Sequence, residues 1–203
     1  MKRIKGKIVI ISSPSGGGKS SICRKLLKKN KDWHFSISYT TRPPRKDETD
    51  GVEYHFVSHS EFQKSKNKDA FAESCQVHRF LYGTPRKPLE KILYSGGVIL
   101  LDVDVKGAKK LKSQYPQAVT IFILPPSGAE LKRRLKKRGT EDDKHLRIRR
   151  KRALSEMKLY KRFDYVVINK DLETAVNEVE MIIKSFHCRL KYLDAEQINR
   201  IVG

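Results

Sequence analysis

KIVIISSPSGGGKSSICRKLLKK, residues 7–29, is the stretch that decides the fold. Its opening KIVIIS is a short apolar run rich in β-branched residues, which predicts a buried strand at 7–12. Consecutive glycines then interrupt regular structure, and apolar residues follow at helical spacing. The segment is therefore predicted to be a strand, a glycine loop and a helix over 19–29.

A strand, a glycine loop and a helix in this order are typical of a phosphate-binding P-loop. Glycines let backbone N–H groups converge on phosphate oxygens, and the helix N-terminus adds positive potential. Lys19 is expected to reach the β- and γ-phosphates of ATP, and the Ser20 hydroxyl to hold Mg²⁺. Ser13 stands where the pattern begins with glycine, and the alternative is an ordinary strand-to-helix loop. The predicted ATP-binding residues of the loop are Ser15, Gly16, Gly17, Gly18, Lys19, Ser20 and Ser21.

Further apolar runs predict strands at 97–104, 118–124 and 165–169. Helical patterns separate or follow them at 106–115, 129–138, 146–160 and 172–186. Buried strands alternating with helices predict an α/β fold whose parallel sheet is covered on both faces. Residues 35–89 contain prolines, turns and short mixed runs, which predict an inserted lobe of short strands with one helix near 59–65.

Asp102 lies near the end of the strand predicted at 97–104. An acidic residue on a strand beside the P-loop supports Mg²⁺ in many P-loop enzymes. Asp102 is therefore predicted to hold the metal together with Ser20, through a water molecule. The alternative is an acidic residue that merely ends a strand in a turn.

The chain is strongly basic. It contains 44 Lys and Arg residues and 23 Asp and Glu residues, which gives a formal net charge of +21. Such a field attracts polyanions, so we expect at most weak, salt-sensitive, non-specific binding of nucleic acid. The alternative is that the charge belongs to a solvated lysine-rich surface.

The 3 cysteines show no paired spacing, which argues against a disulfide framework. The apolar run at 8–11 is too short for a signal peptide or a membrane span. We expect a cytoplasmic protein without a membrane partner.

Short motifs follow the P-loop in order along the chain. They are SISYTTRPPR (36–45), GVEYHF (51–56), FAE (71–73), YGT (82–84), LDVD (101–104), PPS (125–127), RLKKRGT (134–140) and VINKDL (167–172). With this ordered set the chain resembles the guanylate kinases, a family of P-loop nucleoside monophosphate kinases, over roughly residues 7–187. The resemblance implies transfer of the γ-phosphoryl group from ATP to GMP or dGMP with Mg²⁺, a step of purine nucleotide recycling.

The resemblance also implies an architecture of three parts. A P-loop-type parallel-sheet core flanked by helices is expected at 1–33, 89–125 and 156–203, a small mixed-β lobe for GMP at 34–88, and a helical lid at 126–155. The tail at 188–203 has apolar residues at helical spacing, so it either packs on the core or joins a second subunit. A monomer and a homodimer both remain open.

The predicted GMP site combines a phosphate end and a base end. Arg42 and Arg45 are three positions apart in a proline-braced segment, so both guanidinium groups can close on one phosphate; the alternative is surface charge. Guanine presents N1–H and N2–H₂ donors side by side, which one carboxylate can accept, and the resemblance gives that role to Glu73. The full set that it implies is Ser38, Arg42, Arg45, Tyr54, Glu73, Tyr82, Gly83, Thr84 and Asp104.

Arginines crowd the predicted lid, where phosphoryl transfer needs positive charge around the moving group. The resemblance assigns catalytic contacts to Arg134, Arg138 and Arg149, alongside Lys19 and Arg42, and an adenine contact to Asn169. The chain departs from the family's usual pattern at Arg150, where an apolar residue is usual, and at Lys170, where Asp is more frequent. Arg133, Arg147 and Arg152 are expected on a solvated helical face.

Two other functions fit parts of this sequence. A guanylate-kinase-like binding module would have lost the ATP loop, whereas the Gly-Lys-Ser loop and the lid arginines are kept here. Another P-loop kinase would act on a different acceptor, against which the TTRPPR segment, Glu73 and YGT argue.

Overall fold

The computed structural model describes residues 5–77, 79–137, 143–188 and 200–202. Five parallel strands form the core sheet in the order β2-β7-β1-β8-β9. These strands are β1 (Lys7–Ser12), β2 (Trp33–Phe35), β7 (Val98–Asp102), β8 (Val119–Leu124) and β9 (Tyr165–Ile168). In the central pairs Ile11 lies opposite Asp102 on one side and Ile121 on the other. The carboxyl end of β1, from which the P-loop leaves, therefore lies next to Asp102.

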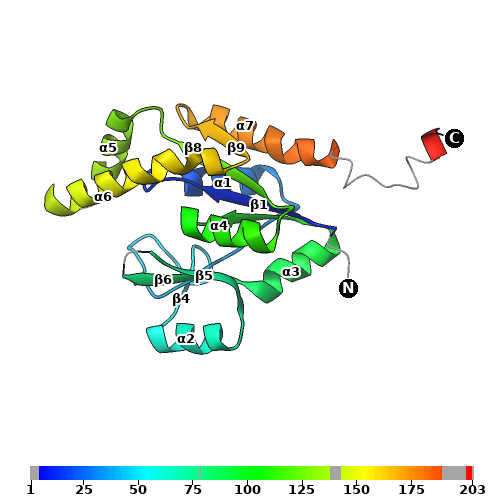
Figure 1. Cartoon of the computed structure of the whole chain (residues 1–203), viewed down its shortest axis with the longest axis horizontal. Coiled ribbons are helices and arrows are strands. Elements are labelled where there is room, and N and C mark those ends of the chain that lie inside the picture. The colour runs from blue at the N-terminus through cyan, green and yellow to red at the C-terminus, as the bar shows by residue number, and fades with distance from the viewer. Residues whose placement is uncertain (1–4, 78, 138–142, 189–199, 203) are drawn as a thin grey trace.

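Helices cover both faces of this sheet (Figure 1). Successive side chains of a strand point to opposite faces, so Val9 and Ile11 pack with α1 (Lys19–Lys29) and α7 (Leu172–Ser185). Ile8 and Ile10 pack with α3 (Arg86–Ser95) and α4 (Val105–Gln114) on the other face. Because both faces are buried, the strands carry continuous apolar runs in place of an alternating pattern.

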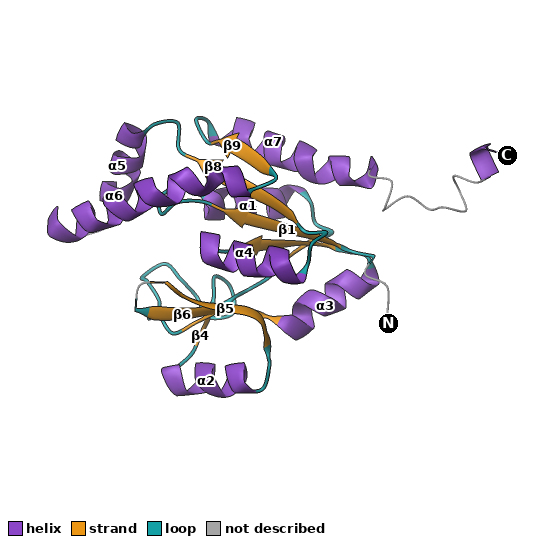
Figure 2. Cartoon of the chain, in the orientation of Figure 1, coloured by secondary structure: helices purple, strands orange, loops and turns teal. Residues whose placement is uncertain are grey.

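A second, four-stranded sheet lies outside the core (Figure 2). Its order is β4-β3-β6-β5, formed by β3 (Tyr39–Thr40), β4 (His55–Phe56), β5 (Phe71–Val77) and β6 (Phe80–Pro85). β3 and β4 are parallel, and the other pairs are antiparallel. The helix α2 (His59–Asn67) begins at a Ser58–Glu61 capping box, and its Phe62 stacks on Phe71 with ring centroids 4.7 Å apart. The lobe thus has its own small apolar centre.

Two further helices pack against each other beside the core sheet (Figure 1). They are α5 (Gly128–Lys137) and α6 (Asp143–Met157). Leu131 and Leu135 of α5 pack against Ala153 of α6, and all three side chains are buried. A 3₁₀ turn at Lys158–Arg162 then leads into β9, and a second follows α7 at Phe186–Cys188.

The α/β fold with a parallel core sheet and a mixed small lobe is confirmed. The strand predicted at 7–12 and the helix at 19–29 match β1 and α1, while β2 and α3 were not predicted. β2 and α3 run across the predicted boundaries at 33/34 and 88/89, and the division into core, lobe and lid stays a prediction. Most of the tail at 188–203, expected either to pack on the core or to join a second subunit, falls in 189–199 and 203, outside the described residues. In the described part of the chain, no helix combines the length and apolar character that a membrane span requires.

Candidate active site

The P-loop joins β1 to α1 through two glycines in the left-handed region. Gly16 has φ +88° and Gly18 has φ +99°, values that glycine adopts without a Cβ clash. Ser13 needs no such dihedral, because Asp69 is the only non-glycine residue with positive φ in the described part of the chain. The serine at the first position of the pattern is therefore compatible with this loop.

Lys19, Ser20 and Asp102 form the polar centre of the phosphate end. Lys19 Nζ lies 2.8 Å from Asp102 Oδ1, and the Ser20 hydroxyl donates to Asp102 Oδ2 at 2.8 Å. Burial of Lys19 opposes its charge, but the Asp102 carboxylate more than offsets this and raises the pKa of Lys19 above its ordinary value. Lys19 is therefore a permanent cation at the place where phosphate charge would collect.

Glu73 lies at the opposite, base end of the site, on β5. Burial raises the pKa of this carboxyl to about 7, a hydrogen bond from Thr84 opposes the rise, and the charge of Asp104 adds to it. Thr84 Oγ1 donates to Glu73 Oε1 at 2.9 Å. The other oxygen, Oε2, is buried and accepts no hydrogen bond from the described residues. Glu73 thus has one oxygen fixed by the fold and one available to a ligand.

Asp104 caps the first turn of α4 close to Glu73. Its Oδ1 accepts the Gly107 N–H at 2.8 Å and the Cys75 thiol at 3.4 Å. Burial and the neighbouring Glu73 carboxylate raise the pKa of the Cys75 thiol, so the thiol stays a hydrogen-bond donor. Donors from β5, β6 and α4 therefore fix the two acidic side chains at the base end.

The two arginines predicted for the acceptor phosphate lie in the loop after β3. The guanidinium carbon of Arg42 lies 5.4 Å from the centroid of the Tyr54 ring and 5.7 Å from that of Phe56. Tyr54 in turn meets Tyr82 edge-on, with centroids 5.9 Å apart. Burial and the nearby Asp102 raise the pKa of Tyr54, which keeps its hydroxyl protonated as a donor.

One cavity of about 650 Å³ joins these parts. Most of the predicted site residues line it: Ser15, Gly16, Gly18, Lys19, Ser20, Ser38, Arg42, Arg45, Tyr54, Glu73, Tyr82, Asp102, Asp104 and Arg149. A space of this size that runs from a P-loop to a buried carboxylate suits two nucleotides placed end to end. Arg138 lies outside the described residues.

The remaining predicted residues that the structure describes are not among those that line the cavity. Thr84 donates a hydrogen bond to Glu73. Gly83 leaves room for the ring of Phe71, which would lie 2.9 Å from a Cβ at position 83. Asn169 is buried and donates from Nδ2 to the Gly17 carbonyl at 3.0 Å, while Arg134 donates to the Asn169 carbonyl at 2.9 Å. Gly17 and Ser21 are the other two residues in this group. In this structure Asn169 and Arg134 both donate to the Gly17 carbonyl and so help to hold the P-loop in place.

Several cavity residues were not predicted from the sequence. Cys75 lies two positions after Glu73 on the same strand, and that spacing could have indicated it. The expectation that Arg152 lies on a solvated face is wrong, because it lines the cavity and its Nε contacts Glu156 Oε1 at 3.1 Å. Glu156 Oε2 also accepts the Ser15 N–H at 3.4 Å, which connects α6 to the P-loop. Arg133 is exposed as expected.

Comparison with known proteins agrees with this geometry. The family model described as "Guanylate kinase" matches residues 5–186. The guanylate kinase of Caldanaerobacter subterraneus subsp. tengcongensis is 44% identical over 185 residues, which cover 91% of this chain and 90% of that relative. The chain belongs to the guanylate kinase family. The guanylate kinase of Nitrosomonas europaea is 46% identical over 178 residues, covering 88% of this chain and 89% of that relative.

A solved guanylate kinase has the same fold. The crystal structure of guanylate kinase from Anaplasma phagocytophilum superposes with a TM-score of 0.80 at 31% identity, covering 96% of this chain and 93% of that chain. The guanylate kinase resemblance predicted from the ordered motifs is therefore confirmed.

Proposed function

We propose that this guanylate kinase transfers the γ-phosphoryl group of ATP to GMP, or to dGMP, giving ADP and GDP. One observation carries the proposal: the P-loop lysine Lys19 and the buried carboxylate Glu73 line the same cavity. The P-loop suits the triphosphate of the donor, and the carboxylate suits the base of the acceptor. The family membership supports both assignments.

At the donor end, backbone N–H groups of the P-loop and the Lys19 ammonium would hold the β- and γ-phosphates. Asn169 and Arg134 support this loop through the Gly17 and Asn169 carbonyls. Asn169 is also our candidate for an adenine contact, as the family resemblance implies.

Mg²⁺ fits the same end of the site. Ser20 and Asp102 supply a hydroxyl and a carboxylate, the hard oxygen donors that Mg²⁺ prefers, and they already lie within hydrogen-bond distance of each other. No group of three or more His, Cys, Asp or Glu side chains gathers among the described residues, which agrees with an ion held mainly by phosphates and water. When bound, Mg²⁺ would neutralise part of the charge on the phosphates.

At the acceptor end, Glu73 Oε2 would accept the N1–H and N2–H donors of guanine. Adenine has no such pair, so AMP would leave this buried oxygen unsatisfied, at a cost of about 1–3 kcal/mol or more for a charged group. Ser38 and Asp104 line the cavity beside Glu73 and would complete the base contacts. Arg42, Arg45, Tyr54 and Tyr82 would hold the GMP phosphate.

The lid arginines would complete the charge balance. Arg149 lines the cavity, and its NH2 group lies 3.4 Å from Ser15 Oγ, so it reaches the P-loop. A guanidinium at this point can follow negative charge that spreads over the transferred group. Arg138 is proposed for the same role from the family resemblance alone.

A coupled assay of ADP release tests the proposal. Each of GMP, dGMP, AMP and UMP is offered with ATP and Mg²⁺, and Lys19→Met serves as the inactive control. We expect turnover with GMP that falls at least about 100-fold in the variant, because Lys19 supplies charge stabilisation. Turnover with AMP or UMP in preference to GMP would contradict the assigned acceptor. A folded protein without turnover on any acceptor would favour a binding module.

A further inference from the structure

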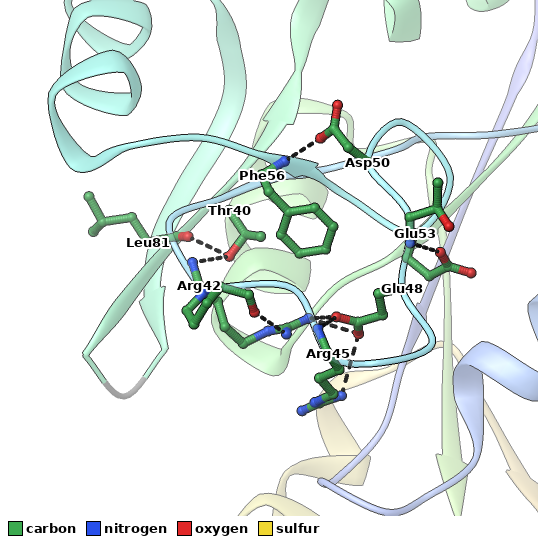
Figure 3. A network of polar contacts seen from close by, with 10 residues as sticks. Thr40, Arg42, Arg45, Glu48, Asp50, Glu53, Phe56 and Leu81 are labelled. Carbon is green, nitrogen blue, oxygen red and sulfur yellow. Dashed lines mark hydrogen bonds and ion pairs between the residues drawn. The ribbon is translucent and has the colours of Figure 1, made fainter.

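A third charged residue accompanies the two arginines of the acceptor loop. Glu48 lies three positions after Arg45, and its carboxylate lies between the guanidinium group of Arg42 and Arg45 (Figure 3). Nothing in the sequence motifs assigns a role to this residue. Its contacts with Arg42 and Arg45 indicate one.

Glu48 is bound by both arginines at once. Arg42 NH2 lies 2.9 Å from Oε1 and 2.9 Å from Oε2 of Glu48. Arg45 donates its backbone N–H to Oε2 at 2.8 Å, and its NH1 lies 3.6 Å from Oε1. A single carboxylate therefore connects the two side chains that are proposed to close on one phosphate.

Arg42 and Glu48 are both largely shielded from water, whereas the Arg45 side chain is not. Their side chains are 11% and 12% exposed, against 66% for Arg45. Arg42 is also held by the Pro43 carbonyl, at 2.7 Å from NH1. Burial opposes the charge of Arg42, but the hydrogen bond and the charge of Glu48 raise its pKa above the ordinary value. Glu48 thus fixes a buried guanidinium and tethers an exposed one.

Glu48 could instead compete with the phosphate for these arginines. Two observations disfavour competition. Arg42 and Arg45 line the cavity, whereas Glu48 is absent from its described lining. The Glu48 backbone N–H also donates to the Arg45 carbonyl at 3.1 Å, while the side chain accepts the Arg45 N–H, so the residue is anchored to its own turn. The carboxylate is therefore held by the acceptor loop itself and is not among the groups that line the cavity.

We propose that Glu48 is a positioning residue for the acceptor phosphate. Its carboxylate reduces the repulsion between two neighbouring guanidinium groups and holds them in place before the ligand arrives. Binding of the phosphate then requires less ordering of Arg45 and no movement of Arg42. This inference rests on the proposed function, because it presumes that the ligand at this place is a phosphate monoester such as that of GMP.

The test compares Glu48→Gln with wild type, and uses Asp47→Asn as the matched control. Asp47 is the adjacent, exposed carboxylate, so the control removes the same charge from the same loop. We expect the KM for GMP to rise about tenfold in Glu48→Gln, the size of one lost charge-assisted hydrogen bond, while the KM for ATP stays unchanged. Asp47→Asn is expected to behave as wild type.

Guanosine separates positioning from a general loss of lobe structure. It has the base and the sugar but no phosphate, so its inhibition constant is expected to stay the same in Glu48→Gln. Parallel weakening of guanosine and GMP would overturn the proposal, because it would mean that the whole lobe is disturbed. A lower KM for GMP in Glu48→Gln would also overturn it and would show that Glu48 competes with the phosphate.

The wild-type assay keeps the two proposals apart. If wild type does not phosphorylate GMP, the proposed function fails whatever Glu48 does. If wild type is active and Glu48→Gln matches it in the KM for GMP, only the positioning role fails.

Discussion

Gly17 lies directly against Ser13: a β-carbon on Gly17 would come within 2.7 Å of Ser13 Cβ and 2.9 Å of its hydroxyl oxygen. Ser13 occupies the first position of the P-loop pattern, where glycine is usual. Gly17, four residues later, has no side chain and so leaves room for the Ser13 side chain. The contact makes the two positions interdependent.

Gly17→Ala is therefore expected to distort the P-loop and to lower kcat/KM for ATP about tenfold or more, since the displaced loop supplies phosphate donors. Ser13→Gly placed in the same chain is expected to recover part of the loss. Recovery stays partial because the Ile123 carbonyl would still lie 3.1 Å from the new methyl group. Steady-state kinetics of the two single variants and the double variant measure this. Strictly additive losses would contradict the coupling.

The pKa of Glu73, raised to about 7 by burial, makes GMP binding depend on pH. In the proposed function the carboxylate form is the one that accepts the guanine N–H donors, so the KM for GMP should fall as the pH rises from about 6 to about 8. GMP itself titrates near the lower limit, and Glu73→Gln serves as the control for that contribution. A pH profile that is identical in wild type and Glu73→Gln would exclude Glu73 as its source.

The raised pKa of Glu73 also makes the free energy of unfolding depend on pH. The folded state keeps the Glu73 proton up to about 7, whereas the unfolded chain releases it near the ordinary value of 4.5. The contribution of this proton to the free energy of unfolding is fully present below that ordinary value and is lost as the pH rises through about 7. Urea unfolding at about pH 5 and about pH 8 should show Glu73→Gln gaining stability relative to wild type at the higher pH. A constant difference would contradict the shift.

Thr84 holds Glu73 in place without lining the cavity itself. Thr84→Val removes the donor to Glu73 Oε1 while keeping the shape, and should raise the KM for GMP several-fold, corresponding to about 1 kcal/mol. Thr84→Ser keeps the hydroxyl and should restore most of the affinity. The KM for ATP is the internal control, and a change in it equal to that for GMP would indicate a wider disturbance.

Glu156 connects α6 to the P-loop through the Ser15 N–H. Glu156→Ala should raise the KM for ATP several-fold and change the KM for GMP little, because the contact lies at the donor end. Asp32→Asn, an exposed carboxylate before β2, is the matched control for loss of charge. Equal effects of the two substitutions on ATP would reduce the role of Glu156 to long-range electrostatics.

The main core elements could be predicted because each is indicated by the pattern of apolar residues within its own segment. The apolar run of β1 and the helical spacing of α1 do not depend on the rest of the chain. β2 was missed because it contains only WHF, and its strand form depends on pairing with β7. The helix α3 was missed because its first residues fall in the segment at 35–89 that was interpreted as an inserted lobe, and Pro88 lies in its first turn, where proline is tolerated.

The candidate site was predicted where a motif fixes a residue type, and missed where a contact crosses the chain. Lys19, Asp102 and Glu73 stand at motif positions and line the cavity. The Glu156 contact to Ser15 spans 141 positions, and no local pattern indicates it. Glu48 was missed although it is local, because a glutamate beside arginines in a charged loop ordinarily indicates only a surface pair.

Asp102 and Asp104 lie two residues apart on one segment, yet they belong to opposite ends of the cavity. Asp102 contacts Lys19 and Ser20, and Asp104 contacts the turn of α4 and Cys75. Two residues of extended chain span roughly 6–7 Å whatever the lobe or the lid does. This segment therefore fixes the distance between the two residues that carry these carboxylates. Because only Val103 lies between them, neither Asp102 nor Asp104 can shift along the chain without displacing the other.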